Sequence, residues 1–316
     1  MYCILEDVKK EKQITAKKVI LVSFTVDLLD IVLSLGVALI TGSVIMLTET
    51  LEGVSDFVSS GLLLIGLKRS TRREDRSHPF GYGREIYFWT LLAALIMFGV
   101  TSTVSIYLGW ERFLHPHPVY NILLAQIVLL VTLSTNGYAF FLSYRRLLKK
   151  RNWRQIIRIF YRSSLVETKT TFILDLMGSM ASFVGTIALA IYVITGDVRF
   201  DGIGAMLIGI VLAVLAFLLL MGIRDLLVGR SASAETEAKI HEAALEIDEV
   251  REVLDLKTLH VGSEKLLVNL EVNMEGNLST QELEKLMDRV KERIQIEVPS
   301  VKYIQVELET PDKALT

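Results

Sequence analysis

The stretch GSVIMLTETLEGVSDFVSSGLLLIGLK, Gly42–Lys68, combines two properties that conflict with each other. It is long and apolar enough to cross a membrane, yet it contains Glu49, Glu52 and Asp56. A carboxylate at bilayer depth is energetically expensive and therefore indicates a functional site. Glu52 and Asp56 are four residues apart, so they share one face of a helix, and Glu49 lies one turn earlier. These stacked acids predict a cation that neutralises them.

The rest of the chain is also typical of a membrane protein, because 51% of its 316 residues are hydrophobic and the mean hydropathy is +0.44. The one cysteine, Cys3, allows neither an internal disulfide nor a cysteine-rich zinc site. Six apolar segments each supply the roughly 20 residues that a membrane helix needs. We place them at residues 17–41, 43–68, 86–113, 119–147, 168–195 and 201–228.

The connections between these segments alternate in charge. Those after the first, third and fifth segments are short and poor in Lys and Arg, whereas the N-terminus and the remaining connections are basic. Because basic loops stay in the cytoplasm, both termini are expected there. The same rule explains the basic run Arg145–Arg162, so we expect contacts with anionic lipid headgroups and no nucleic-acid partner.

After Gly229 the chain becomes acidic and typical of a soluble domain. The expected elements are a helix at 235–247, strands at Val250–His260 and Lys265–Met274, a helix at 280–294 and a strand at Val301–Glu309. This αββαβ order predicts a cytoplasmic, ferredoxin-like α+β domain, which dimerisation would stabilise because it has only about 85 residues. The expected division is a cytoplasmic N-terminal segment at 1–16, an all-α six-helix transmembrane domain at 17–229 and this C-terminal domain at 230–316.

Further acids occupy the first and fifth apolar segments. Asp27 and Asp30 are three residues apart, and Glu167, Thr171 and Asp175 form a polar stripe at four-residue steps. Carboxylate and hydroxyl oxygens suit divalent cations such as Mn²⁺, Fe²⁺ or Zn²⁺. A site that spans two helices can be opened and closed when one helix moves against the other.

No Lys or Arg is expected at the depth of these acids. Lys169 lies near the cytoplasmic end of its segment, where its side chain can extend to the interface. The alternative to metal binding is that protonated carboxyl groups of Glu52, Asp56 and Asp175 serve as hydrogen-bond donors between helices.

Several motifs in this sequence resemble those of the cation diffusion facilitator family. The most specific is HPFGYGREIYFW, residues 78–89, which opens the third segment, and the string FDGIG at 200–204 opens the sixth. The resemblance extends from Thr15 to Pro311. It implies a homodimer that exchanges cytoplasmic metal, typically Zn²⁺, Mn²⁺ or Fe²⁺, for protons, with no cofactor and no enzymatic activity.

The resemblance also implies where the metal binds. The transport site would use Glu52 and Asp56 of the second segment with Thr171 and Asp175 of the fifth. Thr171 stands where the family commonly has His or Asp, and the absence of imidazole favours harder ions than zinc.

A second family site lies in the loop between the second and third segments. Asp75 and His78 match it, but Tyr82 replaces a further His, so a weak site or none is expected.

Without a GxxxxGK[ST] nucleotide-binding motif, transport would be secondary and driven by protons. Asp30 or Glu49 is then a candidate proton relay. The alternative function is a membrane sensor or scaffold that binds metal without transporting it.

Overall fold

The structure is a computed structural model that describes residues 27–148, 166–274 and 278–309. The expected N-terminal segment 1–16, the start of the first apolar segment and most of the basic run Arg145–Arg162 lie outside the described residues. The chain separates into two compact units. One comprises Met1–Lys68 and Ile86–Arg224, and the other comprises Arg69–Glu85 and Asp225–Thr316.

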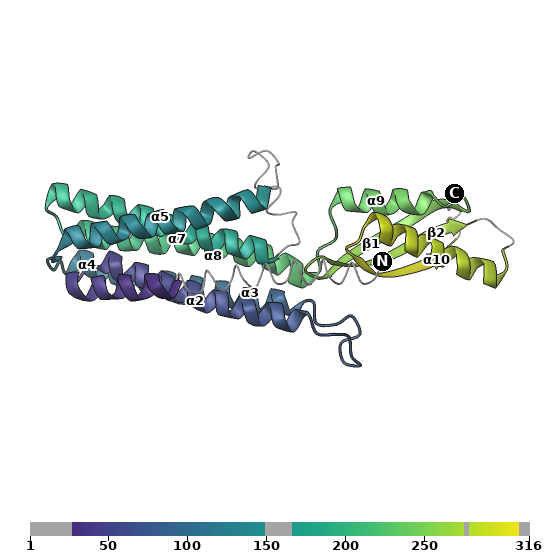
Figure 1. The fold of residues 1–316 in the computed structure, drawn as a ribbon, viewed down its shortest axis with the longest axis horizontal. Coiled ribbons are helices and arrows are strands. Elements are labelled where there is room, and N and C mark those ends of the chain that lie inside the picture. The colour runs from purple at the N-terminus through teal and green to yellow at the C-terminus, as the bar shows by residue number, and fades with distance from the viewer. Residues whose placement is uncertain (1–26, 149–165, 275–277, 310–316) are drawn as a thin grey trace, which may run out of the picture. The chain divides into compact units, whose positions relative to one another are not determined.

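Within the described residues, five helical spans are long and apolar enough to cross a membrane. They are α2 (Val44–Ser70), the continuous span of α3 (Glu85–Ile96), η1 (Met97–Thr101) and α4 (Ser102–Leu114), then α5 (Ile122–Leu148), α7 (Val166–Thr195) and α8 (Arg199–Val228) (Figure 1). Residues 27–41, the described part of the first expected segment, are also helical. The predicted helical membrane domain is confirmed, and the protein is a multi-pass membrane protein.

The third span is not the uninterrupted α-helix that its apolar sequence predicts, because η1 is a π-helical turn. Ser102 Oγ donates to the Met97 carbonyl, 3.0 Å away, and Thr101 Oγ1 is hydrogen-bonded to Ser55 Oγ of α2. Such turns inside α-helices occur frequently at functional sites. This one contacts α2 one residue before Asp56.

The N-terminus of α2 is held by Asp201 of α8, whose side chain is fully buried. The carboxylate accepts hydrogen bonds from Ser43 Oγ at 2.6 Å and from the backbone N–H groups of Val44 and Ile45 at 2.8 and 3.2 Å. Arg112 of α4 lies 3.5 Å from the same carboxylate. A carboxylate at this position satisfies N–H groups that have no partner within the helix. One residue therefore joins α2, α4 and α8.

Glycines allow α4 and α8 to approach each other closely. A Cβ atom on Gly202 would lie 2.6 Å from the Gly109 carbonyl oxygen, and one on Gly209 would lie 2.9 Å from the Ser102 carbonyl oxygen. Small residues at such crossings are the usual means by which membrane helices pack.

The second unit contains the predicted α+β fold. Its elements are α9 (Ala234–Leu245), β1 (Val250–Gly262), β2 (Lys265–Met274), α10 (Thr280–Glu297) and β3 (Val301–Leu308). The central strand β2 is antiparallel to β1 and parallel to β3. Both helices cover one face of this sheet (Figure 1), where Ile240 of α9 and Val290 of α10 share a core with Val268 of β2. The expected αββαβ order is confirmed, and Ser279 caps α10 with a capping box.

The segment Arg69–Glu85, which links α2 to α3, belongs to this second unit. Glu74 accepts hydrogen bonds from the ammonium of Lys302 and from Tyr303 Oη, which is 2.6 Å away. The ring of Phe80 packs edge-on against Tyr303, with centroids 5.3 Å apart. The α2–α3 loop is therefore attached to β3 of the same unit.

Candidate metal-binding site

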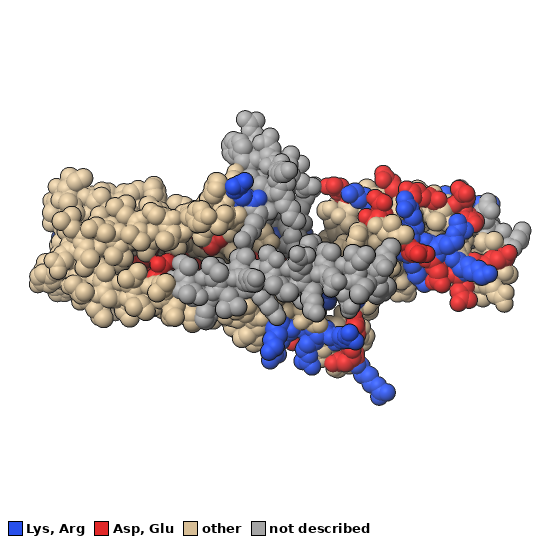
Figure 2. Space-filling model, viewed as in Figure 1, with Lys and Arg blue, Asp and Glu red and all other residues tan. Residues whose placement is uncertain are grey.

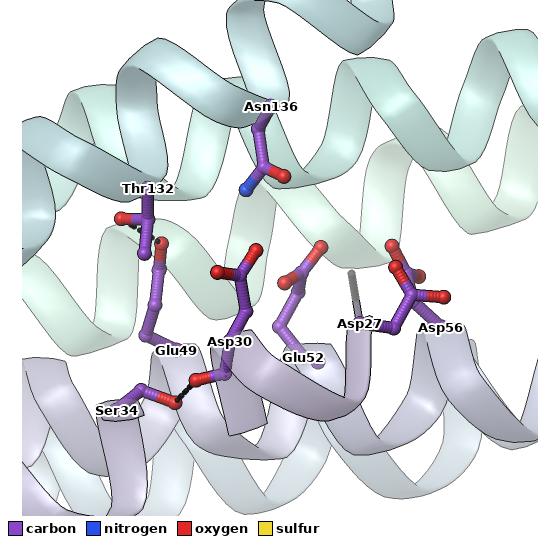
Figure 3. A pocket seen from close by; sticks show the side chains of 9 residues that line it. Asp27, Asp30, Ser34, Glu49, Glu52, Asp56, Thr132 and Asn136 are labelled. Carbon is purple, nitrogen blue, oxygen red and sulfur yellow. Dashed lines mark hydrogen bonds between the residues drawn. The ribbon is translucent and has the colours of Figure 1, made fainter. Parts of the chain in front are cut away.

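A pocket in the first unit lies between the helix of residues 27–41, α2 and α5 (Figure 3). Its lining consists of Asp27, Asp30, Ser34, Glu49, Glu52, Gly53, Asp56, Thr132 and Asn136. Five of these nine residues are acids and none is basic, so the pocket attracts cations. Figure 2 shows a few acidic side chains between the helices of this unit, on a face that otherwise carries little charge.

Glu52 and Asp56 come together on one side of α2, as their spacing predicts. Both carboxyl groups line the same pocket. Among the described residues, Glu52 Oε1 and Asp56 Oδ1 are buried without a hydrogen-bond partner. Buried carboxylate oxygens are normally satisfied, so this pair has the capacity to bind a proton or a metal ion.

Glu49 lies in the same pocket but in a different environment. Its Oε1 accepts hydrogen bonds from Thr132 Oγ1 of α5, 3.3 Å away, and from Ser182 Oγ of α7. Its Oε2 is buried and has no hydrogen-bond partner within the part of the chain that the structure describes. Two hydroxyl groups therefore fix this carboxylate and leave one oxygen available for a cation.

The residues predicted from α7, Thr171 and Asp175, are not part of the pocket lining. Asp175 accepts a hydrogen bond from Ser143 Oγ of α5 and lies within electrostatic range of Asp27 and Asp56. Thr171 Oγ1 donates to the backbone carbonyl of Glu167 at 2.9 Å. Within residues 27–148, 166–274 and 278–309, no three His, Cys, Asp or Glu side chains are arranged closely enough to hold one metal ion.

Lys169 differs from its sequence expectation. Its side chain is almost fully buried at the start of α7, with a relative exposure of 1% for the residue, so the prediction that it extends to the interface is wrong. A lysine is therefore buried inside the transmembrane unit, on the same helix as Asp175.

In the loop, Asp75 and His78 do come together, with 3.6 Å between Oδ1 and Nδ1. Asp75 Oδ1 also accepts from the backbone N–H groups of Ser77 and His78, at 3.0 and 2.8 Å, and Oδ2 accepts from Tyr82 Oη at 2.7 Å. The Tyr82 hydroxyl contributes most to a pKa of Asp75 that lies well below its usual range. A metal ion at this second site would have to displace these hydrogen bonds.

Sequence reasoning did not single out the uncharged polar groups around the acids. Thr132, Asn136 and Ser143 of α5 and Ser182 of α7 all lie within or beside the pocket. The available signal was weak, because Ser and Thr are common in membrane helices. Asn136 is the exception, since a carboxamide in the middle of an apolar segment is costly unless it has a partner.

Two family models match this chain. One, described as the cation efflux transmembrane domain, matches residues 20–228, and the other, described as the cytoplasmic domain of cation efflux proteins, matches residues 232–310.

Individual relatives are similar over most of this chain. The proton-coupled zinc antiporter SLC30A9, mitochondrial, of Homo sapiens is 27% identical over 285 residues, which are 87% of this chain and 50% of that protein. The chain thus spans about half the length of this relative. The cation-efflux pump FieF of Shewanella oneidensis is 25% identical over 258 residues, or 81% of each chain.

Among solved structures, the nickel form of a MamM C-terminal domain variant covers 25% of this chain and 100% of its own, with 18% identity and a TM-score of 0.24.

The transmembrane family model by itself spans more than half of the chain, and it includes the acid-lined pocket and Asp175. The resemblance that the sequence motifs indicate is confirmed: the chain belongs to the cation efflux family.

Proposed function

We propose that this chain exports divalent metal cations of the Zn²⁺, Mn²⁺ or Fe²⁺ class from the cytoplasm in exchange for protons. The observation that carries the proposal is the pair of buried carboxyl groups on α2, Glu52 and Asp56, each with an oxygen that has no hydrogen-bond partner among the described residues. They line a pocket whose described lining residues include no basic side chain. A cation that enters supplies the missing positive charge.

In this proposal the metal binds between α2 and α7, at Glu52, Asp56 and Asp175, with Thr171 one turn along α7. The electrostatic reach between Asp56 and Asp175 supports this assignment. A small movement of α7 against α2 would complete the set of ligands, and the reverse movement would release the ion. Carboxylates lose their protons when they bind metal, so exchange for protons follows from the same groups.

Asp30 and Glu49 are proposed to relay protons beside the metal. Both line the pocket, and the hydrogen bonds from Thr132 and Ser182 hold Glu49 in place. The C-terminal unit is proposed to be cytoplasmic, together with both termini, and to join two copies of the chain in a homodimer. Asp75 and His78 are proposed as a weak additional site at most.

The test is metal flux in sealed vesicles that contain the purified protein and a trapped metal-sensitive dye. A proton gradient should drive metal uptake, and Asp56→Asn or Asp175→Asn should reduce the rate at least about tenfold. Asp197→Asn is the matched control, because Asp197 is an exposed carboxylate outside the pocket. Flux that is undiminished in Asp175→Asn would contradict the site, and saturable binding without any flux would favour a sensor or scaffold.

A further inference from the structure

Among the described residues that line the pocket, Asn136 is the one on α5 that can offer an amide oxygen, and no motif in the sequence assigns it a role. Figure 3 shows its carboxamide pointing from α5 toward the carboxyl groups of Asp30 and Glu52. The side chain is half-buried and lies within hydrogen-bonding distance of Ser182 of α7. It therefore faces the acids from the opposite side of the pocket.

Gly178 of α7 allows this side chain to meet Glu52. A Cβ atom on Gly178 would lie 3.0 Å from Asn136 Nδ2 and 3.2 Å from Glu52 Oε1. The two polar atoms thus approach the same point beside the helix backbone. Gly178 follows Asp175 by three residues, so this point lies one turn along the face of α7 that carries the predicted ligand.

The hydrogen bonds of these groups leave them available for a ligand. Among the described residues, Glu52 is 4% exposed and its Oε1 has no hydrogen-bond partner. The bond from Asn136 Nδ2 to Ser182 Oγ is 3.5 Å long, at the outer limit for a hydrogen bond, and Ser182 donates its own proton to Glu49. Rotation of the Asn136 amide by half a turn would place its oxygen where the nitrogen lies.

We propose that Asn136 is a direct ligand of the transported cation, so that α5 contributes to the transport site together with α2 and α7. This inference rests on the proposed function. A carboxamide oxygen is a neutral, hard ligand, which suits Mn²⁺ better than it suits Zn²⁺. The amide oxygen adds a ligand to the site without adding negative charge. The site would therefore select ions that prefer oxygen ligands. The neutral amide holds the ion less strongly than a carboxylate would, so the ion can still be released.

The experiment measures metal binding to the purified full-length protein by competition between Mn²⁺, Co²⁺ and Zn²⁺. Asn136→Ala should weaken Mn²⁺ binding about tenfold or more and Zn²⁺ binding by a smaller factor, and Asn136→Asp should restore the Mn²⁺ affinity. Ser134→Ala is the matched control, because Ser134 is exposed on the same helix. The visible absorption of bound Co²⁺ should also change in Asn136→Ala, because one ligand is lost.

Two results would overturn the inference. One is an Asn136→Ala variant with the metal affinities and the Co²⁺ spectrum of the wild type. The other is an equal loss of affinity for all three ions that Asn136→Asp does not restore, which indicates a purely structural role. A wild-type protein that binds none of the ions would instead contradict the proposed function, so the two failures are distinguishable.

Discussion

At the scale of single residues, the pocket depends on small and neutral side chains as much as on its acids. Gly178 has no side chain, and this allows Glu52 and Asn136 to occupy the space beside α7. Hydroxyl groups of Thr132 and Ser182 fix Glu49 without adding charge. The acids are therefore held in place by groups that cannot neutralise them.

Gly178→Ala tests this arrangement directly. The added methyl group would lie 3.0 Å from the Asn136 amide nitrogen and 3.2 Å from the Glu52 carboxylate, so both must shift by a few tenths of an ångström. We expect metal affinity to fall several-fold, because ligand geometry tolerates little displacement. Isothermal titration of the purified protein measures the change. Gly61→Ala on α2 is the control, because a Cβ atom there meets nothing within 4 Å; equal affinities in the two variants would argue against a site at Gly178.

The sequence predicts the acids but not their neighbours, and the reason is physical. Glu52 and Asp56 are recognisable because a charge in an apolar segment is rare and a four-residue step fixes a helix face. Asn136 and Ser182 come from other helices, and helix periodicity carries no information on which helices pack together. The burial of Lys169 was missed for the same reason, because only packing decides whether a long side chain reaches water.

At the scale of elements, α2 is positioned by a residue 157 positions away along the chain, because Asp201 accepts from the backbone of Val44. Asp201→Ala would leave Arg112 without its carboxylate and the first N–H groups of α2 without an acceptor. We expect a loss of about 3–5 kcal/mol in stability, the usual result of breaking a buried ion pair from one side. Thermal unfolding in detergent measures it. Asp201→Asn keeps an acceptor oxygen and should lose less; equal losses would show that the hydrogen bonds are unimportant.

The α2–α3 loop depends on pH through Glu74. Hydrogen bonds from Lys302 and Tyr303 lower the pKa of Glu74 from 4.5 to about 2. A carboxylate with a lowered pKa stabilises the folded loop above its ordinary pKa, and this contribution is lost as the pH falls from about 4.5 toward 2. Hydrogen exchange in residues 69–85, corrected for its intrinsic pH dependence, should therefore rise over that interval.

The matching variant at neutral pH is Glu74→Gln, which removes the charge permanently. Trypsin should then cut faster in the loop, which contains several arginines, than it does in the wild type. Glu284→Gln on α10 is the control for the loss of one surface charge. A loop that trypsin cuts at the wild-type rate in Glu74→Gln would show that the contact with β3 does not hold it.

At the scale of the whole molecule, much of the architecture follows from the sequence. Hydropathy gives the membrane spans, and the alternation of Lys265–Met274 gives β2 with its observed bounds, because both patterns are local. The π-helical turn Met97–Thr101 and the attachment of Arg69–Glu85 to the second unit depend on contacts between distant segments. Such contacts produce no periodic pattern in the sequence from which they could be predicted.

The balance of charge in the pocket leads to a prediction for the whole protein. Five acids line the pocket, and a single divalent ion brings only two positive charges, so protons must neutralise the remainder. A metal ion that binds Glu52 and Asp56 must displace the protons that these carboxyl groups carry. Metal binding should therefore release protons, and affinity should fall about tenfold for each released proton when the pH is lowered by one unit.

Calorimetry in buffers of different ionisation enthalpy counts these protons. Glu52→Gln keeps the size of the side chain but removes an acid, so its binding should release fewer protons than the wild type, while the exposed control Asp197→Asn should release the same number. Affinity that does not change between about pH 6 and 8 would mean that the acids are already ionised before the metal arrives. Metal and protons would then not compete for these carboxylates, and coupling would need a separate proton path through Asp30 and Glu49.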